Sequence, residues 1–184
     1  MKRLLVLIFL LSFRAGPIKI LELPDGKLEW TTERPGNARF CVPAAFTDLD
    51  GRIEGEYRLK GVVHNPGGRR KVSICDDTFI IDRKWHSNSG FTQLILVNDG
   101  KANRFRDKKK FVRRALCKKD GHVFLVESRH RMTLTTFAAE CAKVSTHAVY
   151  LDMGIYGYGY LEGKRLSSWA FFYRGKQTNW LCIR

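Results

Sequence analysis

Apolar and polar residues alternate along much of the chain from residue 18 onward, which is the repeat expected of β-strands. Four Asp-Gly dipeptides separate these segments, at positions 25–26, 50–51, 99–100 and 120–121. Asp-Gly readily adopts the positive φ angles of tight hairpin turns, so each dipeptide is predicted to join two antiparallel strands. The expected strands are 18–23, 27–32, 39–46, 55–63, 71–81, 92–98 and 122–128.

One segment has the three-to-four-residue repeat of an amphipathic helix, with Leu134, Phe137, Ala138, Cys141 and Val144 on one face. The residue before it, at position 133, is a threonine, a suitable N-cap, so a helix is expected over about 133–145. The chain then returns to extended character at 148–151, 168–173 and 179–183. These patterns predict an α+β fold: a strand-rich, mixed or antiparallel sheet of hairpins with one main helix.

The first 15 residues read as a signal peptide. A basic start, Met1-Lys2-Arg3, precedes an apolar run from Leu4 to Phe13 that is too short to span a bilayer. The alternative is a buried N-terminal strand or helix. From the signal-peptide pattern we expect an exported protein, periplasmic or secreted and without a transmembrane anchor, in which residues 16–184 form a single domain. A hydrophobic content of 44% and a charged content of 28% are typical of a folded globule.

The formal net charge of +15 raises the question of a polyanionic partner. Basic residues are most concentrated in segment 104–114, with Lys118 and Lys119 beyond it. Runs of charge are often only solvated loops, so both interpretations stay open. No nucleic-acid-binding motif is present, and an exported protein would rarely meet that ligand, so nucleic acid ranks last among the partners.

Five cysteines are scattered through the chain, without a C-x-x-C pair and without histidines at zinc-ligand spacing. The sequence therefore predicts neither a structural metal site nor a cofactor, and it leaves open whether a divalent metal is required. In an exported protein one or two disulfides could form, but the pairing cannot be read from the spacing, and most of these residues suit a buried core. The cysteines are Cys41, Cys75, Cys117, Cys141 and Cys182.

An ordered set of segments resembles the phosphodiester glycosidase family, whose relatives include the enzyme that uncovers mannose phosphates by removing N-acetylglucosamine. The set begins with "CVPAAFTDLDGRIEGEY" and continues with "FTQLILVNDGK", "FVRRALCKKDGHVFLVES", "MTLTTFAAECAKV" and "HAVYLDMG". The family signals they match look like "NGGFFD", "DGK", "RTAIG" and "NLDGGGS". The chain differs in Val42-Pro43-Ala44-Ala45 and in Met153, where the family has Asn or Gly. Such changes suit either a divergent subfamily or a protein that kept the fold and lost the reaction.

The resemblance implies two catalytic residues. Arg113 stands at the arginine of the "RTAIG" signal, and a guanidinium can hold two oxygens of a departing phosphate. Asp152 stands at the aspartate of the second signature and would act as a nucleophile or as a base for water. Without the resemblance, Arg113 is one charge in a basic run and Asp152 is a turn-capping residue.

Four further residues are candidates for binding the substrate. Gln93 resembles a glutamine of the family and could bond sugar hydroxyls, although an exposed strand face would also suit it. Glu127 could supply a second carboxylate, or it could pair with a nearby basic residue. Gly154 matches the second signature, and Tyr156 could stack on a sugar ring or pack across strands.

Two functions therefore follow from the sequence. The first is an exported glycosidase-like hydrolase acting on a sugar phosphodiester or a related glycosidic linkage, with a carbohydrate or phosphorylated glycan as its substrate. The second is a catalytically inactive module that binds an anionic glycan or another polyanion. The sequence does not predict which sugar or linkage is recognised, the stereochemical outcome of the reaction, or the oligomeric state.

Overall fold

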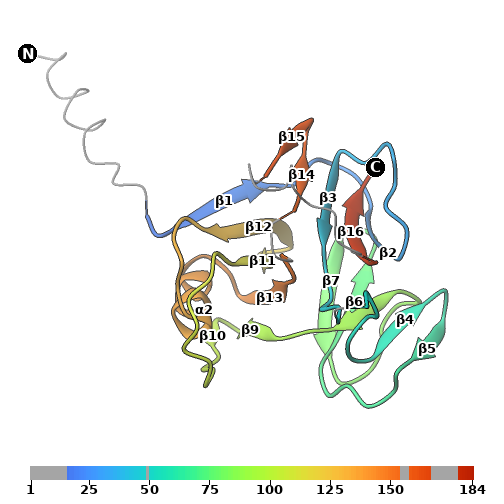
Figure 1. The fold of residues 1–184 in the computed structure, drawn as a ribbon, viewed down its shortest axis with the longest axis horizontal. Helices are drawn as coiled ribbons and strands as arrows, with labels where there is room; N and C mark the ends of the chain where they lie inside the picture. The colour runs from blue at the N-terminus through green and yellow to red at the C-terminus, as the bar shows by residue number, and fades with distance from the viewer. Residues whose placement is uncertain (1–15, 49, 154–157, 167–177) are drawn as a thin grey trace, which may run out of the picture.

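Three antiparallel sheets and one helix make up the described part of the chain (Figure 1). The structure, a computed structural model, describes residues 16–48, 50–153, 158–166 and 178–184. Its strand-rich α+β architecture with one main helix is the one that the sequence predicts. No helix in these ranges has the length and apolar character that a membrane span needs.

The first sheet carries the helix and the candidate catalytic residues. Its strand order is β1-β12-β11-β13-β9-β10, and every neighbouring pair is antiparallel. Strands β11 and β13 lie at its centre, so the residues at their ends are surrounded by other strands. The strands are β1 (Ile18–Glu22), β9 (Ile95–Asn98), β10 (Lys101–Ala102), β11 (Arg114–Lys119), β12 (His122–Ser128) and β13 (His147–Leu151).

Helix α2 (Leu134–Val144) packs against one face of this sheet. The Thr133 hydroxyl accepts a hydrogen bond from the backbone N–H of Thr136 at 3.1 Å, which satisfies one of the free amides of the first turn. The predicted apolar face is the buried one, because Leu134, Phe137 and Cys141 join the core. The helix and its cap are confirmed.

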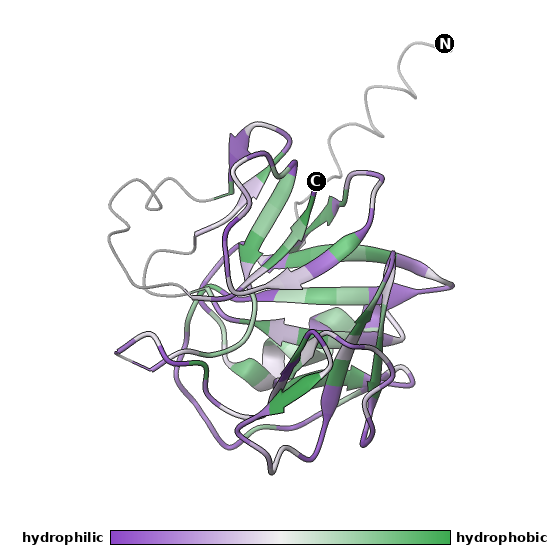
Figure 2. Ribbon diagram, turned by 90° about the vertical axis from the view of Figure 1, so that its right-hand side faces the viewer, coloured by the Kyte–Doolittle hydropathy of each residue, from purple (hydrophilic) through white to green (hydrophobic). Residues whose placement is uncertain are grey.

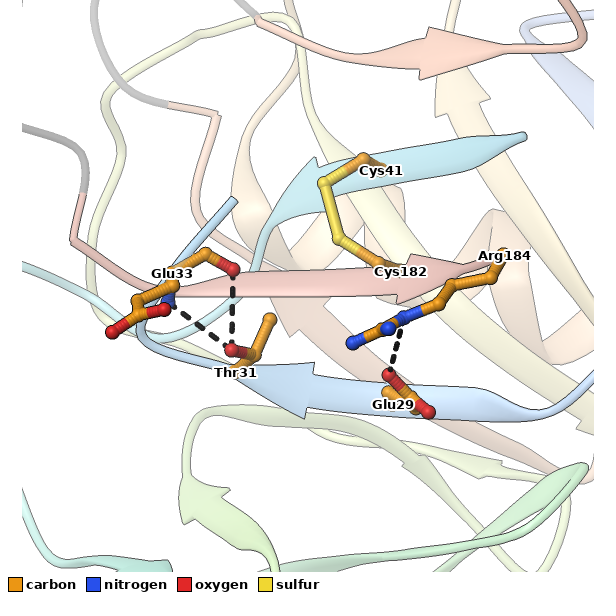
Figure 3. Close-up of a disulfide and its surroundings, with 6 residues drawn as sticks. All are labelled: Glu29, Thr31, Glu33, Cys41, Cys182 and Arg184. Atoms are coloured by element: carbon orange, nitrogen blue, oxygen red, sulfur yellow. Dashed lines mark hydrogen bonds and ion pairs between the residues drawn. A yellow bond between two sulfur atoms is a disulfide. The ribbon is translucent and has the colours of Figure 1, made fainter. Parts of the chain in front are cut away.

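The second sheet has a disulfide between two of its strands. Its strand order is β15-β14-β3-β16-β2, and the central strands β3 and β16 place Cys41 opposite Cys182. These two cysteines are bonded across the strand pair, as Figure 3 shows, and the link joins positions 141 residues apart in the chain. The strands are β2 (Leu28–Thr31), β3 (Phe40–Pro43), β14 (Tyr160–Leu161), β15 (Lys164–Arg165) and β16 (Trp180–Ile183).

The third sheet is a set of short hairpins with order β5-β4-β8-β6-β7. Tight turns join β4 to β5 and β6 to β7, so the sheet is built largely from local contacts. The strands are β4 (Tyr57–Leu59), β5 (Val62–His64), β6 (Lys71–Cys75), β7 (Thr78–Asp82) and β8 (Gly90–Thr92).

One apolar cluster connects the three sheets. Leu116 and Val149 reach it from the first sheet, Val42 from the second, and Phe79 and Phe91 from the third, all of them 0% exposed. Figure 2 shows the hydrophobic segments along the strands, with hydrophilic residues in the turns and loops around them. The sheets therefore share a core on the side of the first sheet opposite α2.

The predicted turns are confirmed in part. Asp99-Gly100 joins β9 to β10, with φ angles of 49° and 74°. Asp120-Gly121 joins β11 to β12, with φ angles of 50° and 82°. The hairpin expected at Asp25-Gly26 is wrong, since β1 and β2 belong to different sheets. The dipeptide at 50–51 lies near one isolated antiparallel bridge.

Three of the expected strands are each divided in two. Segment 55–63 is the hairpin β4–β5, because Lys60 and Gly61 form a turn with φ angles of 49° and 85°. Segment 71–81 is the hairpin β6–β7, which turns at Asp76. Segment 92–98 leaves the third sheet after β8 and enters the first sheet at β9, so it connects two sheets. The strand expected at 168–173 lies outside the described residues.

A buried carboxylate fixes the turn that precedes β6. Glu56 is 5% exposed and accepts hydrogen bonds from the backbone N–H groups of Gly67 at 2.8 Å and Gly68 at 2.9 Å, and from the Trp85 indole at 2.8 Å. It also pairs with the Lys71 ammonium. Burial alone would raise the pKa of Glu56, but these donors, with Lys71 foremost, outweigh it and lower the pKa to about 2.

This shift predicts acid sensitivity with a definite sign. The folded pKa of Glu56 lies below the ordinary value of 4.5, so its contribution to stability is complete above about pH 4.5 and is lost as the pH falls toward 2. We expect Glu56→Gln to lower the free energy of unfolding by about 3 kcal/mol at pH 7 and to flatten its dependence on pH in that window. Urea titrations at several pH values measure both effects. Exposed Glu54→Gln is the matched control, and equal pH slopes in the two variants would contradict the assignment.

Candidate functional site

Arg113 lies just before β11, almost completely buried. Its side chain is 4% exposed, and its guanidinium donates to the carbonyls of Met132 at 2.9 Å and Lys109 at 2.8 Å. The same group lies 5.6 Å from the ring centroid of Phe111 and 5.8 Å from that of Tyr150. Two of the five N–H donors of this guanidinium are therefore engaged by backbone carbonyls, while its charge lies against two aromatic faces.

Asp152 follows β13 directly and lies opposite Arg113. The register pairs Arg114 of β11 with Leu151 of β13, so Arg113, just before β11, and Asp152, just after β13, are the next opposed positions of the same antiparallel ladder. The backbone N–H of Asp152 donates to the carbonyl of Ala44 at 2.9 Å. This bond ties the end of β13 to the segment that follows β3.

Tyr150 connects the two predicted catalytic residues electrostatically. Burial is the main cause that raises the pKa of its hydroxyl, the negative charge of Asp152 raises it further, and the positive charge of Arg113 opposes both. The charges of Arg113 and Asp152 therefore have opposite effects on the pKa of this hydroxyl. The Tyr150 ring also packs against Phe46, with centroids 5.6 Å apart, which fixes its position.

Gln93 joins the same cluster through a shared acceptor. Its side-chain N–H donates to the Ala44 carbonyl at 3.3 Å, the atom that also accepts from Asp152, and its side-chain oxygen accepts from the N–H of Leu94 at 2.9 Å. Gln93 lies between β8 and β9, where the chain passes from the third sheet to the first. The structure therefore brings together three predicted site residues, Arg113, Asp152 and Gln93.

Ala44 and Ala45, which we call the Ala44–Ala45 junction, are held in place by a buried amide. Asn179 is 0% exposed; its side-chain oxygen accepts from the N–H of Ala45 at 2.7 Å and its side-chain nitrogen donates to the Ala45 carbonyl at 3.1 Å. The same oxygen accepts from the Trp30 indole at 3.3 Å. Asn179 was not a sequence candidate, because nothing near it in the chain marks it as more than the start of a strand.

Glu127 is engaged elsewhere. Its carboxylate accepts from the guanidinium of Arg114 at 2.7 Å and 2.6 Å, and Arg114, which is 0% exposed, also donates to the Tyr158 carbonyl. Glycine at position 159 permits this arrangement, since a Cβ there would lie 3.0 Å from both terminal nitrogens of Arg114. Of the two roles open to Glu127, the pairing with a basic residue is the one that the structure contains.

Arg113 and Arg114 point to opposite faces of the first sheet, as successive strand residues do. Ala115 and Cys117 share the face of Arg113 and pack toward α2. Leu116 shares the face of Arg114 and packs into the core shared by the three sheets. The two neighbouring arginines therefore lie in two different environments. If the start of β11 had been known, strand alternation would have predicted that Arg114 points to the face opposite Arg113. Gly154 and Tyr156 lie outside the described residues.

In the described ranges, no group of three or more His, Cys, Asp or Glu side chains is placed to hold a metal ion. The candidate site consists instead of a carboxylate, a guanidinium, a phenol hydroxyl and an amide. Such a set can bind hydroxyl and phosphate oxygens and can move a proton to or from a carboxylate.

No family model matches the chain, and no curated protein matches it. A solved structure does: a hypothetical protein from Synechocystis is similar with a TM-score of 0.50 and 11% sequence identity. The match covers 93% of this chain and 58% of the other, so this chain spans less than two thirds of that protein's length. The likeness concerns the fold alone.

The buried pair Arg114–Glu127 should be costly to break on one side. We expect Arg114→Met to lower the free energy of unfolding by about 3–5 kcal/mol, because Glu127 would remain buried without its partner. The double variant Arg114→Met/Glu127→Leu should recover most of this loss, since neither charge is then left buried. Urea unfolding of the single and double variants measures the coupling, with exposed Arg129→Met as the control. Strictly additive effects would contradict a coupled pair.

Proposed function

We propose that the chain is a hydrolase of the phosphodiester glycosidase type, which cleaves a sugar phosphodiester or a related glycosidic linkage beside Asp152. The observation that carries the proposal is the convergence of residues far apart in the sequence. The backbone N–H of Asp152 and the side-chain amide of Gln93 donate to the same carbonyl, that of Ala44. Arg113 lies opposite Asp152 in the strand ladder, with its guanidinium 5.8 Å from the ring centroid of Tyr150. The resemblance described above supplies the reaction class.

The proposed chemistry divides the work among these groups. Asp152 acts as the nucleophile or as the base that activates water at the anomeric carbon. The phosphate that leaves is a good leaving group, so it needs positive potential more than a strong acid, and Arg113 supplies that potential next to Asp152. The Tyr150 hydroxyl is protonated at neutral pH, because burial raises its pKa above an ordinary value that already lies well above 7, so it can donate a hydrogen bond to the phosphate.

Turnover of a phosphodiester tests this assignment. We expect the purified protein to hydrolyse an aryl or sugar phosphodiester, and Asp152→Asn to lower kcat by about a hundredfold or more, because the carboxylate is then absent. Asp77→Asn, at an exposed position of the third sheet, is the matched control and should keep full turnover. Arg113→Lys, which keeps the charge but not the planar fork, should lower kcat with a smaller change in the unfolding midpoint than Arg113→Ala. Turnover that survives in Asp152→Asn would refute the mechanism.

A second function is favoured by the basic segment before Arg113, which is exposed and anchored to the fold. Phe105 exchanges two hydrogen bonds with the Thr135 hydroxyl, at 2.9 Å and 3.1 Å, which fixes the segment to α2. Five exposed cations surround this anchor, and none forms an ion pair with a described residue. They are Arg104, Arg106, Lys108, Lys109 and Lys110. A catalytically inactive protein could bind an anionic glycan here.

Salt dependence distinguishes this second function. We expect the triple variant Lys108→Gln/Lys109→Gln/Lys110→Gln to lose at least tenfold in affinity for a sulfated polysaccharide and to show a weaker dependence on salt, because bound counterions are no longer released. Fluorescence anisotropy at several salt concentrations measures both quantities. Changing three exposed lysines elsewhere, Lys19, Lys84 and Lys164, to Gln is the matched control. An equal loss in the two triple variants would show only a general effect of net charge.

A further inference from the structure

An open hollow of about 420 Å³ lies beside Gln93. Its walls come from two sheets: Arg70 stands just before β6 of the third sheet, and Lys101 begins β10 of the first. Gln93 belongs both to this hollow and to the cluster around Asp152, because its amide bonds the Ala44 carbonyl. The lining residues are Arg70, Gln93, Leu94, Ile95, Asn98, Lys101 and Asn103.

The charge of the hollow is positive. Arg70 and Lys101 both line it, and no Asp or Glu does. Neither cation forms an ion pair with a carboxylate in the described part of the chain, so their charges remain available to a ligand. Two such charges lining one hollow attract an anion more strongly than either does alone.

The amides of the hollow are held in fixed positions. The Asn103 side-chain nitrogen donates to the Ile95 carbonyl at 2.8 Å, and the backbone N–H of Asn103 donates to the Leu96 carbonyl at 2.8 Å. Gln93 is held in the same way by Ala44 and Leu94. The hydrogen bond from its nitrogen holds the Asn103 side chain, whose oxygen is an acceptor suited to a hydroxyl group.

An apolar surface completes the hollow. Leu94 lines it with a side chain that is 38% exposed, and Ile95 lies next to Leu94. A sugar ring presents C–H groups on one face and hydroxyls at its edge, so it matches a wall that combines Leu94 with amides. An inorganic anion alone would leave this apolar surface uncovered.

We infer that this hollow binds a sugar carrying a negatively charged group, such as a phosphate, sulfate or carboxylate, with the charge between Arg70 and Lys101 and the hydroxyls against Gln93 and Asn103. The inference rests on the proposed function in taking the hollow as a second contact surface of the substrate. It adds that the substrate carries an anionic group apart from the linkage cleaved beside Asp152.

Binding without turnover tests the inference. Glucose 6-phosphate, a monoester with no diester to cleave, is titrated into the full chain and followed by NMR shifts of the side-chain amides of Gln93 and Asn103. We expect it to bind at least tenfold more tightly than glucose, and glucuronate to fall between the two. Arg70→Gln and Lys101→Gln should each weaken binding about fivefold or more, because each removes a charge-assisted contact. Arg69→Gln and Lys119→Gln, exposed cations outside the hollow, should leave the affinity unchanged.

The outcomes separate this inference from the proposed function. If glucose 6-phosphate and glucose bind equally, or if all four variants behave alike, the hollow is not an anionic-sugar site even when the protein cleaves a phosphodiester. If inorganic phosphate binds as tightly as glucose 6-phosphate, the sugar contacts are refuted. Binding that depends on Arg70 and Lys101 in a protein without turnover would uphold the hollow and overturn the hydrolase.

Discussion

The Ala44–Ala45 junction is the constraint on which the rest of the structure depends. Ala44 follows β3 of the second sheet, and its carbonyl accepts from Asp152 at the end of the first sheet and from Gln93 at the exit of the third. Asn179 bonds both polar groups of Ala45. Each of these backbone groups is buried and would be costly without a partner, so the three sheets can meet only in an arrangement that satisfies them.

The same constraint explains how the candidate site is assembled. Gln93 and Asp152 are 59 positions apart in the chain, yet one carbonyl oxygen sets both of their positions. A substitution that widened the Ala44–Ala45 junction would therefore disturb the candidate site without changing any of its side chains. Alanine suits this place because both residues are 0% exposed, and a larger side chain would have to displace core residues.

Local patterns predicted the helix, the hairpins at Asp99-Gly100 and Asp120-Gly121, and the apolar character of β13, since each depends on residues close in the chain. The hairpin at Lys60-Gly61 was missed because lysine rarely adopts a positive φ, and here the flanking strands impose it. The division of the chain among three sheets was beyond local reasoning, because it depends on distant contacts. Asn179 shows this for the site, since its role appears only when β16 lies beside β3.

The neighbouring residues Arg113 and Arg114 show how a buried cation limits what a site can do. Arg114 is balanced by Glu127 at hydrogen-bond distance, whereas Arg113 is surrounded by carbonyls and rings, neither of which carries a full negative charge. Burying a charge is unfavourable without a counter-charge. The strand register places Asp152 opposite Arg113 in the first sheet. Under the proposed function, a substrate phosphate at Arg113 would supply the counter-charge that this buried cation needs, which would link substrate binding at the candidate site to the stability of the fold.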